Sequence, residues 1–184
     1  MAVTFLTSLE RLRYEQIPSS VSEEEISIYF QLSAQDLELV EVQRGKENRI
    51  AFALQLCIIR FIGYLPDNWQ TTVPEKTREI IGQQLMIDKS FLKNYGTRAA
   101  TKTEHLHVIL KYIGFSKWAP LDNVPLETWL LERAMEHDKP TLLLDLACEK
   151  LVTQNILRPS IGIVLPGQNG QLILMLDFFY TRLV

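Results

Sequence analysis

Cysteine and histidine are scarce in this sequence, whose 184 residues contain two cysteines and three histidines. Cys57 and Cys148 each lie in an apolar helical pattern, so we expect reduced core thiols rather than a disulfide framework or a catalytic thiol. His105 and His107 stand two positions apart, which on a helix turns them about 200° away from each other. No cysteine or acid completes a ligand set at the usual spacing. Neither a metal site nor a cofactor is predicted.

Long hydrophobic runs are also missing. No stretch reaches the roughly 20 apolar residues needed to cross a bilayer, and the first residues do not have the pattern of a secretory signal. The glycines at 162, 167 and 170 lack the Lys-Ser/Thr of a phosphate-binding loop, and no nucleophile elbow occurs. We therefore expect a cytoplasmic, non-catalytic protein without a membrane segment.

The alternation of apolar and polar residues that marks strands does not occur before residue 160. Helix start signals are frequent instead, in the form of capping boxes in which Ser or Thr precedes an acid by three residues. These pairs are Ser22 with Glu25, Ser33 with Asp36, and Thr101 with Glu104. The pattern predicts an all-α, multi-helical fold. Helices are expected near 4–14, 23–31, 34–43, 48–62, 74–86, 89–95, 102–113, 125–137 and 140–154.

Two stretches that contain proline, residues 64–73 and 115–124, are the longest expected loops and the candidate joints between subdomains. The end of the chain, GIVLPGQNGQLILMLDFFYTRLV, is apolar, rich in turn residues and almost uncharged. We expect it to be either disordered or a short β-hairpin that turns at Pro166 to Gly170. The predicted domains are a first helical lobe at 1–63, a second helical lobe at 74–159 and an aberrant apolar tail at 160–184.

Charge is unevenly distributed along the chain, although its net charge is only −3. Residues 1–43 carry a net charge of −6, residues 44–118 of +6 and residues 119–184 of −3. A local basic region can bind a polyanion whatever the total charge, because counterion release depends on the phosphates that nearby side chains contact. The distribution is compatible with nucleic-acid binding by the central segment, and chance clustering of solvated charge gives the same sums.

The basic segment opens with RGKENRIAFALQLCIIRFIG, residues 44–63. At about 100° per residue, one face of this helix carries Arg49, Ala53, Leu56 and Arg60. The other faces are too apolar for a surface helix, which predicts a central element of the fold. The free N–H groups of its first turn favour a phosphate together with the side chains around them, which are Arg44, Lys46, Asn48 and Arg49. In the alternative interpretation, Asn48 caps the helix, Arg49 is solvated and Arg60 pairs with an acid from an acidic helix.

A second polar and basic lead-in precedes the helix expected at 102–113. It contributes two cations, Arg98 and Lys102, and two hydroxyls of the kind that contact phosphates, Thr101 and Thr103. A basic entrance followed by an apolar helix therefore occurs twice. We expect the two lobes to grip one extended DNA site across successive grooves.

The residues resemble the N-terminal region of the Tn-three family of replicative transposases over roughly residues 5 to 160. The resemblance begins with the run SEEEISIYFQLSAQDLELVEVQRGKENRIAFALQLCIIRFIG. It continues through Tyr95, Arg98, Thr101, His105-Leu106, Gly114-Phe115 and LVTQNILRP. In that family this all-helical region recognises the terminal inverted repeats of the transposon. A much longer C-terminal part carries an Asp-Asp-Glu strand-transfer centre, for which this chain has no room.

The resemblance implies DNA binding without catalysis, with the double-stranded DNA of transposon ends and full-length transposase subunits as partners. The tail departs from the family pattern, which continues through a charged linker, and is the expected result of truncation or a frameshift. The residues expected to bind DNA are Arg44, Lys46, Asn48, Arg49, Arg60, Arg98, Thr101, Lys102 and Thr103. A helical protein-interaction adaptor is the alternative, in which the segregated charges serve a protein partner or the docking of acidic and basic lobes.

Overall fold

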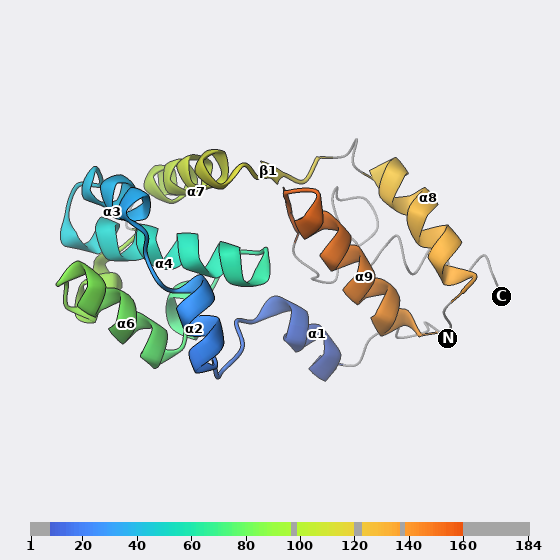
Figure 1. The fold of residues 1–184 in the computed structure, drawn as a ribbon, viewed down its shortest axis with the longest axis horizontal. Helices are drawn as coiled ribbons and strands as arrows, with labels where there is room; N and C mark the ends of the chain where they lie inside the picture. Colours follow the sequence, from blue (N-terminus) through green and yellow to red (C-terminus); the bar gives the residue numbers. More distant parts are fainter. Residues whose placement is uncertain (1–7, 97–98, 120–122, 137–138, 160–184) are drawn as a thin grey trace. The chain divides into compact units, whose positions relative to one another are not determined.

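The computed structural model describes residues 8–96, 99–119, 123–136 and 139–159, which are mostly helical (Figure 1). The prediction of an all-α fold is confirmed, with two very short strands added. The elements are α1 (Ser8–Glu15), α2 (Glu23–Tyr29), α3 (Ala34–Glu41), α4 (Lys46–Ile62), α5 (Trp69–Thr72), α6 (Glu75–Leu85), the 3-10 helix η1 (Lys89–Asn94), α7 (Ala99–Ile113), β1 (Ser116–Lys117), α8 (Asn123–Ala134), α9 (Pro140–Thr153) and β2 (Ile156–Leu157). The predicted tail at 160–184, with its hairpin, lies outside the described residues.

The chain divides into two compact units. Ile17–Gly114 form one, which we call the central unit, and Met1–Gln16 with Phe115–Val184 form the other, which we call the terminal unit. The expected lobes at 1–63 and 74–159 have other boundaries. The reason is that α4, from the first expected lobe, packs against α6, η1 and α7 from the second.

The two expected joints have different outcomes. The stretch 115–124 begins where the central unit ends. The stretch 64–73 lies inside the central unit, where it contains α5 and the buried side chain of Trp69. Its proline-containing composition indicates an irregular connection, but α4 and α6 on either side of it still share one core.

Helix α4 forms the centre of the central unit, as its composition predicts. Ten consecutive residues from Ile50 to Ile59 are buried, and α2, α3, α6, η1 and α7 all contact this helix. The exposed fractions of Ala53 and Leu56, which lie between Arg49 and Arg60 on the predicted basic-ended face, are 0%. A buried stretch therefore separates the two arginines, and each acts in its own surroundings.

Capping explains where two of the helices begin. The Ser22 hydroxyl accepts the backbone N–H of Glu25, and the Glu25 carboxylate accepts the backbone N–H of Ser22. The box predicted at Ser33 and Asp36 is confirmed in the same way at the start of α3. The box predicted at Thr101 is wrong, because α7 begins two residues earlier, at Ala99.

The terminal unit has a core of its own, built by α1, α8 and α9. Its buried side chains are Tyr14, Leu126, Leu130, Leu143, Leu144, Ala147 and Leu151. The Tyr14 hydroxyl donates to the Asp145 carboxylate at 2.7 Å and ties α1 to α9. Burial raises the pKa of Tyr14, and so does this hydrogen bond. Strands β1 and β2 pair in parallel, with Ser116 opposite Ile156.

We expect Phe52→Ala to lower the free energy of unfolding by roughly 3 to 5 kcal/mol, because the ring is fully buried in α4 and its loss leaves a cavity. Urea unfolding followed by circular dichroism measures the change. Val42→Ala is the control, since Val42 is 76% exposed and should unfold at the parent midpoint. An unchanged midpoint for Phe52→Ala would contradict the central position of α4.

Candidate nucleic-acid interface

Arg60 is held in an ion pair inside the central unit. Its guanidinium donates to both carboxylate oxygens of Asp36, at 2.8 and 2.7 Å. The same carboxylate accepts the Tyr112 hydroxyl at 2.9 Å and the backbone N–H of Ser33 at 2.8 Å. Of the two interpretations that the sequence allowed for Arg60, the structure therefore shows the second, in which it pairs with an acid from another helix, here α3.

The Asp36 carboxylate stays charged although it is fully buried. Burial by itself raises the pKa of a carboxyl, but the hydrogen bonds from Arg60, Ser33 and Tyr112 outweigh burial and hold the pKa of Asp36 well below its usual range. A buried carboxylate of this kind needs its cation. The guanidinium of Arg60 is thus committed to the fold, and we do not count it among the DNA contacts.

Arg49 and Asn48 also have local partners. The Arg49 guanidinium donates to the backbone carbonyls of Gln43 and Glu41, both at 3.0 Å, and so satisfies acceptors at the end of α3. The Asn48 amide donates to the Arg44 carbonyl at 2.7 Å. Asn48 does not cap α4, because the helix begins at Lys46 with Gly45 as its N-cap. Both side chains shape the turn between α3 and α4.

Arg44 and Lys46 are exposed at the start of α4. Gly45 between them has a φ of 87°, and any side chain there would collide with the Glu47 carboxylate, which folds back over this glycine. An acid therefore already occupies the approach to the first turn of α4, so we do not assign a phosphate to the free N–H groups there. The Lys46 ammonium lies 5.2 Å from the centre of the Phe91 ring in η1.

The second basic stretch belongs to the first turns of α7. Lys102 and Thr103 are exposed, and Thr101 is half-buried. The stem of Lys102 covers Gly96, just beyond η1, so that a side chain at Gly96 would collide with it. Arg98 lies outside the described residues. The structure thus brings both basic stretches into the central unit, instead of one into each of two lobes.

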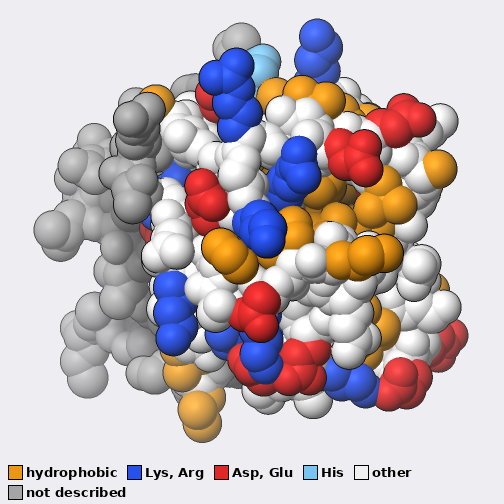
Figure 2. Space-filling view, turned by 90° about the vertical axis from the view of Figure 1, so that its left-hand side faces the viewer, with side chains coloured by type: hydrophobic (Ala, Val, Ile, Leu, Met, Phe, Trp, Pro, Cys, Tyr) orange, Lys and Arg blue, Asp and Glu red, His pale blue; other side chains and the backbone are white. Residues whose placement is uncertain are grey.

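Helices α4 and α7 begin at the same end of the central unit, on the left of Figure 1. Figure 2 shows this end, where Lys and Arg side chains border an exposed hydrophobic area and lie among acidic side chains. A shallow groove of about 380 Å³ here is lined by Leu37, Leu85 and Met86 together with Lys46 and Arg49. Cations, acids and apolar groups therefore share the surface that carries the predicted DNA contacts.

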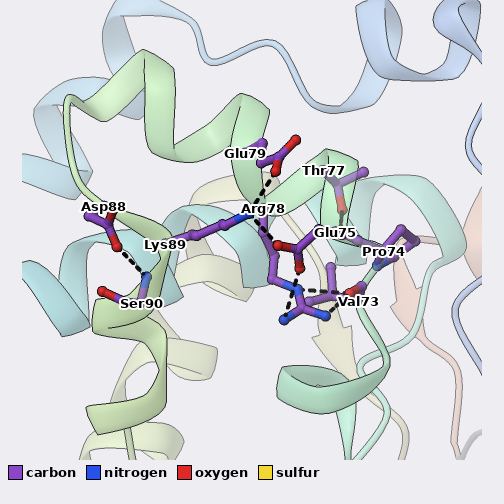
Figure 3. Close-up of polar contacts among 9 residues, drawn as sticks. All are labelled: Val73, Pro74, Glu75, Thr77, Arg78, Glu79, Asp88, Lys89 and Ser90. Atoms are coloured by element: carbon purple, nitrogen blue, oxygen red, sulfur yellow. Dashed lines mark hydrogen bonds and ion pairs between the residues drawn. The ribbon is translucent and has the colours of Figure 1, made fainter.

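Sequence patterns did not reveal a polar cluster between α6 and η1, drawn in Figure 3. Lys89 donates to the carboxylates of Glu75 and Glu79, the latter at 2.6 Å, and so joins the first residue of η1 to one face of α6. The Arg78 guanidinium donates to the Val73 carbonyl at 2.9 and 2.7 Å. The four-residue spacing of Glu75 and Glu79 is a signal for a shared partner, but nothing local indicates that Lys89 reaches both.

His105 belongs to a buried hydrogen-bond chain rather than to a metal site. The Gln55 amide donates to the Tyr95 hydroxyl at 2.8 Å, and this hydroxyl lies 3.1 Å from Nδ1 of His105. Which of the two atoms donates in this contact depends on the tautomer of His105. Burial lowers the pKa of His105. In the described part of the chain, His, Cys, Asp and Glu form no group of three or more that could hold a metal ion.

None of the helices in the described ranges is long and apolar enough to span a bilayer.

Residues 5–165 match the model of a protein family described as a domain of unknown function, DUF4158.

Similar curated proteins include the transposase for transposon Tn501 from Pseudomonas aeruginosa, which is 28% identical over 86% of this chain. The transposase for transposon gamma-delta from Escherichia coli strain K12 is 31% identical over 87% of the chain, and the transposase for transposon Tn1546 from Enterococcus faecium is 30% identical over 85%. The chain spans only 16% of the length of each of these relatives. The resemblance to Tn-three family transposases is thus confirmed.

We expect Arg60→Ala to lower the free energy of unfolding by roughly 3 to 5 kcal/mol, because the variant leaves the buried Asp36 carboxylate without its cation. The double variant Asp36→Ala with Arg60→Ala should lose less free energy of unfolding than the two single variants lose together. Chemical denaturation of all three variants measures these losses. Lys76→Ala is the control, since it breaks an exposed pair with Glu23 and should cost little. Strict additivity would contradict the coupling of Asp36 and Arg60.

Stability should fall as the pH is lowered from 7 to 5, because the unfolded chain protonates His105 near its ordinary pKa while the folded chain, in which that pKa is lowered, does not. This contribution is at most about 1.4 kcal/mol per pH unit, the value for one proton. His105→Gln should flatten the decline in urea unfolding measured at several pH values. His107→Gln removes an exposed imidazole from the same helix, and this variant should keep the decline of stability with falling pH. If the free energy of unfolding fell equally with pH in both variants, the prediction would be contradicted.

Proposed function

Because the chain belongs to the DUF4158 family and is similar to curated transposases, we propose that it takes part in DNA transposition by binding double-stranded DNA at transposon ends. The binding is non-catalytic: this chain supplies recognition and not the strand-transfer chemistry. The observation that carries the proposal is the clustering of both basic stretches at one end of the central unit.

The residues proposed to contact phosphates are polar residues of the two basic stretches whose side chains are exposed in the structure. Arg44 and Lys46 at the start of α4 form one group, and Lys102 with the hydroxyl of Thr103 at the start of α7 forms the other. Phosphate contacts position a protein on the duplex and supply most of its salt-dependent affinity. Both groups belong to one compact unit, so we propose a single DNA-binding face in place of two separate lobes.

We expect the double variant Arg44→Ala with Lys46→Ala to weaken binding to a transposon-end duplex and to a scrambled duplex alike, with little change in thermal stability, because exposed charges contribute little to folding. The slope of log affinity against log salt should fall in magnitude by roughly 0.9 for each lost phosphate contact. Fluorescence anisotropy at several salt concentrations measures both quantities.

The control for this experiment is Lys139→Ala, which removes an exposed lysine from the terminal unit and should keep the parent slope. Lys102→Ala tests the second group in the same assay. A parent protein that shows neither a preference for the transposon-end duplex nor a steep salt dependence would favour the adaptor interpretation. Parent slopes in both the double variant and Lys102→Ala would show that other residues hold the DNA.

A further inference from the structure

Helices α6 and η1 form a helix-turn-helix pair. Three residues, Met86 to Asp88, separate the end of α6 from the start of η1. Met86 takes the left-handed conformation with a φ of 53°, which reverses the chain at the end of α6, and Ile87 is buried. Asp88 begins η1 by accepting the backbone N–H of Ser90 at 2.8 Å. Two helices joined by a turn of this length are a common way to present the second helix to DNA.

The polar cluster between the two helices attaches the start of η1 to α6 (Figure 3). Lys89 bridges Glu75 and Glu79, which lie one turn apart on α6. The charges of the Glu75 and Glu79 carboxylates are therefore compensated by a lysine of η1. Arg78 lies 3.4 Å from the Glu75 carboxylate and adds a second cation to the cluster. The charges of this cluster serve mainly to position η1.

Helix η1 has one buried side and one polar, exposed side. Leu92 is 4% exposed, and η1 packs against α4. Ser90, Lys93 and Asn94 are exposed. In a 3-10 helix, residues three apart lie one above the other, which aligns Ser90 with Lys93. Both border a groove of about 710 Å³, with Thr71 and Arg78 among its other lining residues.

Contacts with both basic stretches connect η1 to the proposed DNA-binding face. Lys46, at the start of α4, lies over the ring of Phe91 in η1. Lys102, at the start of α7, covers Gly96, two residues beyond the end of η1. Candidate phosphate contacts from both groups therefore lie next to η1 or to the residues just after it. A duplex held by these cations would also lie close to η1.

We propose that η1 enters the major groove of the bound duplex and that Lys93 and Asn94 read base edges there. This inference rests on the proposed function and adds to it the element that distinguishes one sequence from another. Lysine contacts the acceptors of guanine, and asparagine can pair with the donor and acceptor of adenine. Double-stranded DNA fits this side of η1 better than an apolar protein surface does, because its three exposed side chains are all polar.

The test uses the full chain and a duplex that it enriches from a random pool. Anisotropy gives the ratio of its affinities for this duplex and for a scrambled duplex. Lys93→Ala and Asn94→Ala should each lower this ratio roughly five- to a hundredfold, because a lost base contact affects the preferred sequence most. Binding of Asn94→Ala to the scrambled duplex should stay within about twofold of the parent, since asparagine carries no charge to lose. Melting temperatures should match the parent, because both side chains are exposed.

The Arg44→Ala with Lys46→Ala variant is the matched comparison, because it should weaken binding to both duplexes and retain the ratio. If the parent enriches no duplex from the pool and does not bind the scrambled duplex, both the proposed function and this inference fail, and a protein partner becomes the better assignment. If the parent prefers the enriched duplex and both η1 variants keep the parent ratio, η1 does not read DNA while the proposed function stands. A parent that binds DNA but enriches no particular sequence from the pool also overturns the inference.

Discussion

The central unit depends on the buried carboxylate of Asp36. This one group accepts hydrogen bonds from the start of α3, from Arg60 near the end of α4 and from Tyr112 in α7. A fully buried carboxylate is tolerated only when its charge is paired and its oxygens are satisfied. Because α3, α4 and α7 all contribute to this one hydrogen-bonded group, it helps to set how these helices pack against one another.

Internal pairing also changes the meaning of the charge distribution. The acidic segment at 1–43 and the basic segment at 44–118 contact each other inside the central unit through Asp36 with Arg60 and through Glu23 with Lys76. Some of the cations in the basic segment are therefore already paired with acids of the same unit. The cations left at the surface include Arg44 and Lys46 at the start of α4 and Lys102 at the start of α7. The net charge of a segment consequently overstates how many of its side chains a phosphate can reach.

Polar contacts at both ends of η1 show how a short helix can be held in place. A six-residue 3-10 helix has too few hydrogen bonds of its own to be stable alone. Leu92 anchors it to the core, Lys89 attaches its start to two acids of α6, and Asp88 caps it. The buried chain of Gln55, Tyr95 and His105 fixes the residue that directly follows it. Such positioning is what a recognition element requires, because base contacts need a defined orientation.

The sequence alone determined the helical class, the central position of α4 and the capping boxes at Ser22 and Ser33, because periodicity and capping are local properties of the chain. It also carried the family resemblance, which depends on the order of residues. Tertiary structure decided which cations remain available. Arg60 and Arg49 look like Lys46 in a sequence pattern, but the first two meet a buried carboxylate and two backbone carbonyls whose positions only the packed helices define. The division into units was equally non-local, because residues 1–16 join the unit that follows residue 114 through contacts such as Tyr14 with Asp145, which the order of helices along the chain does not reveal.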